Sequence, residues 1–265
     1  MGINLGTTPI ADAKFGNTQV DKIYLGNELV WQNAPTPSTI RALKFECDSS
    51  QSLGIEAAYI GSLTPNFEYS TDGTHWTQWN DLTMTLPFGE GTPLYIRGMN
   101  TVLATATNHV TFNFAQDNNK VRCSGSVMHL FDYTQDLTEF PADPNSQGIA
   151  YLFHGCYALE IPPSLPATTL LPYSYESAFS SCTSLVAIPY LPATVLGEQC
   201  YRNMFNGCSQ IKMASSQSEE YPNEYVFGAN PSGGTYAYRM FRYTGGTFKG
   251  NPDQLTYYTA NEIIR

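Results

Sequence analysis

Cysteine is the residue type whose spacing in this sequence points most directly to a particular chemistry. Cys156, Cys182 and Cys208 recur every 26 residues, an interval compatible with metal binding, disulfide formation or packing. The sequence has no CxxC pair, and none of its four histidines stands at a zinc-ligand spacing from two cysteines, so we predict no metal and no cofactor. Thiols buried in register pack as small apolar groups. We expect reduced cysteines, with a disulfide between neighbouring repeats as the alternative.

Carboxylates could supply acid–base catalysis if two of them were held within about 5 to 10 Å of each other. Glu56, Glu68, Asp72 and Glu90 are the acids considered for such a role. Surface acids of an acidic protein usually serve solvation instead. The sequence also lacks a nucleophile elbow, a zinc-protease motif and a phosphate-binding or dinucleotide-binding glycine loop. We therefore predict that the protein is not an enzyme and has no catalytic residues.

The clearest local signal for ligand binding is the hairpin sequence YSTDGTHW at residues 69–76. Asp72-Gly73 supplies the positive φ of a tight turn, and the stretch resembles an Asp-box hairpin whose Ser-to-Asp-to-Gly spacing is one residue tighter. In such motifs the serine and aspartate side chains bond the turn amides. Trp76 and Trp79 are candidate ligand-binding residues, because an indole ring can stack on a sugar. The alternative is packing in the core or at a sheet edge.

A second group of candidate ligand-binding residues lies in a stretch that interrupts a repeat near the C-terminus. Residues 213–236 contain Ser, Glu, Asn, Tyr and Gly in no repeat pattern, which favours a protruding loop. Aromatic side chains on a loop can offer flat apolar faces with a polar group at one end. The aromatic residues concerned are Tyr221, Tyr225, Phe227 and Tyr236. The alternative is that they cover a widened coil.

Composition and charge exclude several classes of function. Of the 265 residues 14% are charged and 42% are apolar, which is too apolar for a disordered chain. The net charge of −10 disfavours nucleic acid and anionic membranes as partners, since each phosphate contact needs Lys or Arg. No stretch reaches about 18 consecutive apolar residues, so we predict no membrane insertion. The N-terminal residues lack the basic start and apolar core of a secretory signal.

The stretches that must position these residues differ in the spacing of their glycines, prolines and apolar runs. Residues 1–33 contain glycines ten residues apart, each after a large apolar residue, which favours short strands joined by glycine turns. Residues 34–39 contain two prolines and predict a linker. Residues 40–127 hold short alternating runs about ten residues apart, which predicts an antiparallel β-sandwich.

The first stretch is too short to bury its own large apolar side chains. We therefore predict that Phe15, Tyr24, Leu25 and Trp31 are contact residues of an anchor, buried against another protein. The alternative is that the same four side chains are buried against the sandwich that follows.

Residues 128–265 carry the strongest internal repeat. FHGC at 153–156, FSSC at 179–182 and FNGC at 205–208 are 26 residues apart, and Phe241 follows Phe205 by 36. Like residues at a constant period predict coils stacked on one another. The predicted fold class is mainly β: a short β-rich N-terminal anchor, an antiparallel β-sandwich and a leucine-rich-repeat-type β-solenoid.

The repeat text SAFSSCTSLVAIPYLPATVLGEQCYRNMFNGCSQI resembles BspA-like leucine-rich repeats, which carry an MF-x-GC-x-x-L core. The resemblance covers residues 128–258 and implies a β-solenoid with adhesive or ligand-binding use. Such repeats occur in surface proteins of gut bacteria and in proteins of their phages.

The N-terminal texts INLGTTPI and DKIYLGNELVWQ resemble the opening module of fibre proteins from Bacteroides-type phages, including crAss-like phages. This resemblance implies that residues 1–33 attach to a virion capsid or tail protein, that the protein resides on a virion assembled in the bacterial cytoplasm, and that it is a homo-oligomer, expected to be a trimer. The predicted function is a non-enzymatic structural and adhesive head or tail fibre protein that contacts the host or a cell-surface glycan. The alternatives are a secreted or cell-surface adhesin for carbohydrate or host protein, and an accessory module of a polysaccharide-degrading enzyme.

Overall fold

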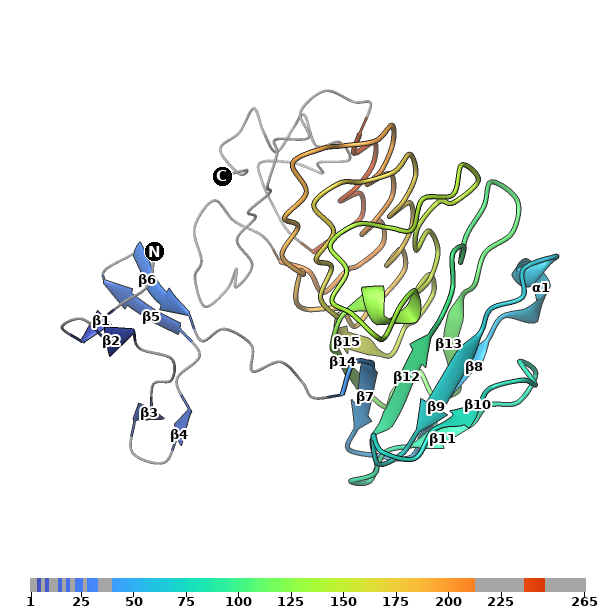
Figure 1. Cartoon of the computed structure of the whole chain (residues 1–265), viewed down its shortest axis with the longest axis horizontal. Coiled ribbons are helices and arrows are strands. Elements are labelled where there is room, and N and C mark those ends of the chain that lie inside the picture. Colours follow the sequence, from blue (N-terminus) through green and yellow to red (C-terminus); the bar gives the residue numbers. More distant parts are fainter. Residues whose placement is uncertain are drawn as a thin grey trace. The chain divides into compact units, whose positions relative to one another are not determined.

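The computed structural model describes residues 40–212 and 236–245 with their side chains, and the strands within residues 4–32 by their backbone alone. The chain divides into two compact units, Met1–Ile40 and Arg41–Arg265. Figure 1 shows the strands of both units.

The first unit contains three two-stranded antiparallel sheets, each made of strands adjacent in sequence. In the sequence Gly6, Gly16 and Gly26 each stand between the two strands of a pair. The pairs are β1 (Asn4–Leu5) with β2 (Thr8–Pro9), β3 (Lys14–Phe15) with β4 (Thr18–Gln19), and β5 (Lys22–Leu25) with β6 (Glu28–Gln32).

The second unit contains two sheets, one of six strands in the order β10-β9-β12-β7-β14-β15 and one of three strands in the order β11-β8-β13. Every neighbouring pair is antiparallel except β14 and β15. The strands are β7 (Leu43–Cys47), β8 (Gln51–Ile55), β9 (Phe67–Ser70), β10 (Thr77–Gln78), β11 (Leu86–Phe88), β12 (Leu94–Gly98), β13 (Phe112–Phe114), β14 (Val121–Ser124) and β15 (Leu159–Ile161). The helices among the described residues are two single turns, α1 (Ala57–Ile60) and the 3-10 helix η1 (Val127–Leu130). The prediction of a mainly β chain is confirmed.

Alternation of apolar and polar residues gives both sheets one buried face. In β7 and β12 every second residue is buried. Phe45 of the larger sheet contacts Phe88, Phe112 and Phe114 of the smaller sheet, with ring centroids 6.0–6.3 Å apart. The buried faces of the two sheets therefore meet in one aromatic core.

After η1 the chain forms four coil segments that lie side by side (Figure 1). Their backbone N–H groups alternate: one donates to the carbonyl three residues earlier, and the next donates to the following segment. Phe153 donates to Ala178 and Phe179 to Met204, and the bonds between neighbouring coil segments measure 2.7–3.0 Å. Each segment thus supplies hydrogen-bond partners to backbone groups of its neighbour, although the segments are built from turns and not from long strands. The coil segments are residues 147–156, 173–182, 199–208 and 237–244.

The repeated phenylalanines follow this backbone ladder. Phe153, Phe179, Phe205 and Phe241 form a continuous stack with centroids 5.3–5.7 Å apart and rings within 9° of parallel. Phe112 of the smaller sheet contacts the first ring of the stack at 5.6 Å. The aromatic core between the sheets therefore continues into the coil segments, across the predicted boundary between residues 127 and 128.

The repeated cysteines form a second ladder beside the rings. All six cysteines of the chain are free and buried. The sulfur of each repeated cysteine donates to a phenylalanine carbonyl in the preceding layer, over 3.0–3.1 Å. Burial raises the pKa of these thiols, so they remain protonated. The donor and acceptor pairs are Cys156 to Phe112, Cys182 to Phe153 and Cys208 to Phe179.

Candidate functional site

The hairpin between β9 and β10 is built as the sequence predicts. Ser70 Oγ accepts the N–H of Gly73 at 2.9 Å, and one carboxylate oxygen of Asp72 accepts the N–H groups of Thr74 and His75 at 2.8 Å each. The other oxygen lies 2.7 Å from His75 Nδ1. Hydrogen bonds from the His75 backbone and ring hold the pKa of Asp72 well below its usual range. Gly73 takes a φ of 76°, so the turn is fixed just before Trp76.

The two predicted ligand-binding tryptophans have different surroundings. Trp79 is 1% exposed, packs against Phe67 at a centroid distance of 6.4 Å, and donates its Nε1–H to the Asp81 carbonyl. An indole enclosed in this way offers no open face to a sugar, so the assignment of Trp79 to ligand binding is corrected to core packing. Trp76 is half-buried and faces Arg97.

Arg97 of β12 is held between two aromatic rings, an arrangement that we call the Arg97 stack. In the register of the sheet Arg97 stands opposite Glu68 of β9, and its Nε donates to the Glu68 carboxylate at 2.7 Å. The guanidinium carbon lies 3.7 Å from the centre of the Trp76 ring and 3.9 Å from that of Tyr133. Each cation–π contact of this kind stabilises by about 0.5–2 kcal/mol. The stack therefore joins the hairpin to the chain after η1.

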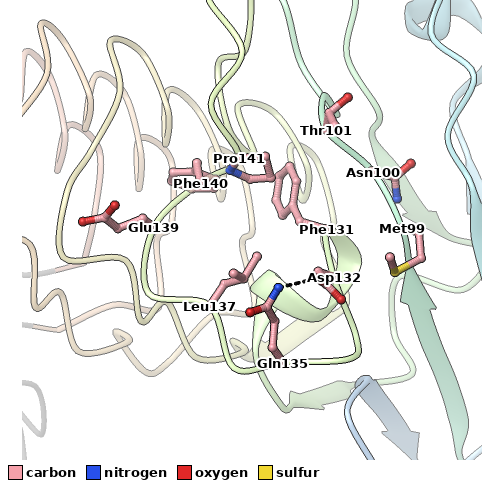
Figure 2. Close-up of a pocket in the computed structure, with 10 residues that line it drawn as sticks. All are labelled: Met99, Asn100, Thr101, Phe131, Asp132, Gln135, Leu137, Glu139, Phe140 and Pro141. Atoms are coloured by element: carbon pink, nitrogen blue, oxygen red, sulfur yellow. Dashed lines mark hydrogen bonds between the residues drawn. The ribbon is translucent and has the colours of Figure 1, made fainter.

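A cavity of about 490 Å³ lies where the chain leaves β12 and passes η1 (Figure 2). Its volume is within the range of small-molecule sites. Met99 of its wall is two residues beyond Arg97, and Asp132 of its wall precedes Tyr133, so the cavity adjoins the Arg97 stack. The lining residues are Met99, Asn100, Thr101, Phe131, Asp132, Gln135, Leu137, Glu139, Phe140 and Pro141.

A ring contact and the hydrogen bonds of one asparagine side chain hold the cavity wall in place. Phe131 and Phe140 meet edge to face, with centroids 5.5 Å apart. The Asn100 side chain accepts the Asn66 N–H at 2.7 Å and donates to the carbonyls of Asn66 and Leu130 at 3.1 and 2.6 Å. These bonds use both N–H donors and one of the two acceptor sites of the Asn100 amide, so Asn100 supports the wall.

The ionised groups of the cavity are carboxylates. Asp132 accepts the N–H and hydroxyl of Thr134 and the Gln135 amide, which is drawn in Figure 2. These hydrogen bonds lower the pKa of Asp132, so it is charged at neutral pH. Glu139 turns its carboxylate away from the other lining side chains (Figure 2).

A second ring cluster joins α1 to the first coil segment, and nothing in the sequence predicted it. The rings of Tyr59 and Tyr151 stack on the His109 imidazole at 4.9 and 4.4 Å. Burial lowers the pKa of His109 and raises that of Tyr151. The Tyr151 hydroxyl donates to Glu176, whose pKa burial raises, and Arg202 pairs with that carboxylate at 3.5 Å. Each ring thus has a partner in a neighbouring segment, as expected of packing.

The structure describes only some of the other predicted site residues, and some of these by their backbone alone. Phe15 lies in β3, Tyr24 and Leu25 in β5 and Trp31 in β6, and their side chains lie outside the described residues. Tyr236 is partly buried against the core, which agrees with the packing alternative. Tyr221, Tyr225 and Phe227 lie outside the described residues.

The four acids considered for catalysis lie on separate elements. Glu56 accepts a hydrogen bond from Asn113, Glu68 pairs with Arg97 and Asp72 holds the hairpin, while Glu90 occupies a turn with a φ of 50°. Within residues 40–212 and 236–245, no group of three His, Cys, Asp or Glu side chains is placed to hold a metal ion. No helix in the same part of the chain is long and apolar enough to cross a membrane.

Arg97 and Tyr133 are the site residues that the sequence did not indicate. Arg97 lies in β12, but its ring partners come from positions 76 and 133, and no local pattern links them. Comparison of the chain with protein families, with curated proteins and with solved structures gave no match.

Proposed function

We propose that the chain is a non-enzymatic structural and adhesive protein of the fibre type. The observation that carries this proposal is the ladder of coil segments, in which each segment completes the backbone bonds and the ring stack of its neighbour. Such an array is stiff along its length and leaves its outer positions free for recognition. The Arg97 stack and the adjoining cavity offer fixed polar and aromatic groups, which suit binding.

We infer that the two sheets of the second unit are a β-sandwich and that the coil segments belong to a leucine-rich-repeat-type solenoid. The ring contacts between the sheets support the sandwich. The 26-residue period of the stacked phenylalanines supports the solenoid. Because the coil segments are built from turns, the solenoid would be a variant of that repeat.

The first unit is the part that we propose to attach to a virion capsid or tail protein, with the intact protein as a homotrimer. Because Met1–Ile40 is a compact unit by itself, an attachment role for it fits a second unit that does not need it for folding. Deletion of residues 1–33 is therefore expected to give a protein that unfolds within about 3 °C of the intact chain's melting temperature but fails to enter particles. Thermal melts followed by circular dichroism and mass spectrometry of purified virions measure the two effects.

The intact chain, expressed in the same way, is the control for incorporation. An unfolded deletion product would show that the first unit is buried against the second, the alternative for its large apolar residues. A deletion product found in virions would place attachment elsewhere in the chain. Absence of the intact chain from virions would favour a secreted or cell-surface adhesin.

A further inference from the structure

Arg97 carries more hydrogen-bonding capacity than the fold uses. A guanidinium has five N–H donors, and within the described residues the Nε–H alone has an acceptor, the Glu68 carboxylate. The terminal nitrogens Nη1 and Nη2 have no acceptor in that part of the chain, and neither is enclosed. The Arg97 side chain is 20% exposed, so its remaining N–H groups reach solvent.

Two other arginines on or beside the same sheet have their terminal nitrogens engaged. Arg122 of β14 directs both Nη atoms at Asp48, over 3.1 and 2.7 Å. Arg41 donates from Nε and Nη2 to Asp136 and from Nη1 to the Thr134 carbonyl. Arg97 differs from both, because two aromatic rings fix the plane of its guanidinium while Nη1 and Nη2 have no acceptor among the described residues.

A fixed guanidinium with two open N–H groups side by side matches the two oxygens of a carboxylate. The Trp76 and Tyr133 rings hold the guanidinium plane, so little side-chain freedom is lost when a ligand binds. Glu68 lies beside the guanidinium and the chain has a net charge of −10, both of which disfavour a ligand with many negative charges. A single carboxylate suits the site best.

We propose that the Arg97 stack binds the carboxylate of an acidic sugar, with the rest of the sugar against the adjoining cavity. Met99 and Asp132 place the cavity next to the stack, and its wall combines apolar with polar side chains. Sugars require this combination, because they present apolar C–H faces together with hydroxyls. The choice of a sugar as the carrier of the carboxylate rests on the proposed adhesive function.

The test compares two sugars that differ in the carboxylate, methyl β-D-glucuronide and methyl β-D-glucoside, by NMR titration of the intact chain. We expect the glucuronide to bind about tenfold more tightly. Arg97→Lys keeps the charge but removes the planar pair of donors, so this preference is expected to fall well below tenfold. Arg122→Gln is the matched control, since Asp48 already engages that arginine, and it is expected to leave both affinities unchanged.

A second variant changes affinity in the opposite direction. Glu68→Gln removes the negative charge beside the guanidinium, so glucuronide binding is expected to tighten about threefold, even if Arg97→Lys fails to fold. Equal affinity of the intact chain for the two sugars would overturn the proposal, as would weaker glucuronide binding in Glu68→Gln. Since the titration uses purified protein, its failure is distinct from a failure to enter virions.

Discussion

Asp72 shows how much local order one exposed side chain can impose. Its carboxylate accepts hydrogen bonds from Thr74 and His75 and lies 3.0 Å from the Ser70 hydroxyl, so one residue fixes the hairpin that leads to Trp76. The Arg97 stack begins at that tryptophan. The aromatic face toward Arg97 therefore depends on a turn whose chemistry could be predicted from the sequence.

The pair of Asp72 and His75 predicts a pH effect at the hairpin. The hydrogen bond and charge of Asp72 raise the pKa of His75 above 6.5. The resulting stabilisation is present in full below pH 6.5 and is lost as the pH rises through the folded-state pKa of His75. NMR titration of the imidazole should give a raised pKa, and Asp72→Asn should bring it back toward 6.5. A value in the intact chain at or below 6.5 would contradict the structure.

Burial of the thiols predicts that the cysteines of the folded protein do not react with thiol reagents. Cys182 is enclosed and donates to the Phe153 carbonyl, and burial raises its pKa well above the ordinary value, so little thiolate forms at pH 8. We expect none of the six cysteines to react with Ellman's reagent in the folded chain and all six to react in guanidinium chloride. A mass of the intact chain two daltons below the reduced value would instead show a disulfide, and peptide mapping would show whether it joins neighbouring repeats.

Among the elements, the coil segments carry an unusual backbone. Apart from Gly148, residues with positive φ stand four positions apart within each coil segment, and eight of the nine non-glycine residues with positive φ among the described ones lie in the coil segments. Four equivalent positions hold Gly155, Ser181, Gly207 and Tyr243, with φ of 71°, 64°, 80° and 60°. Two segments therefore use the residue that adopts this conformation without strain, and the segment between them does not.

This difference predicts a stabilising substitution. Ser181→Gly relieves the left-handed strain at a position where both neighbouring segments already have glycine, and it is expected to stabilise the chain by about 0.5–1 kcal/mol. Denaturation in urea measures the change. The contrast is Ser184→Gly in the same repeat, where φ is not positive and the hydroxyl accepts a hydrogen bond from Lys120 at 2.6 Å, so glycine is expected to destabilise the chain. Loss of stability in Ser181→Gly would show that the serine side chain contributes more than the strain costs.

For the whole molecule, the sequence was informative where contacts repeat. Phe153, Phe179 and Phe205 could be predicted to stack because residues at the same place in successive coils meet. The strand Phe67–Ser70 was also predictable from its alternation and the Asp-Gly turn that follows. Trp79 could not be separated from Trp76 by sequence, since both follow the turn and only the packed core decides which ring is enclosed. The Arg97 stack was not predictable, because it joins three separate segments.

The ladder keeps its pattern where the chain between coil segments changes length. Phe179 donates to a carbonyl 25 residues ahead, and Phe205 to one 35 residues ahead, yet both bonds join adjacent segments and both rings stack on the next. The hydrogen bonds and ring stacking between adjacent segments thus stay the same although the number of residues that connect the segments differs. For protein engineering, the joint between residues 208 and 237 is the natural place to graft a foreign epitope or a randomised peptide, and length variation in a population of such genes should concentrate at that joint.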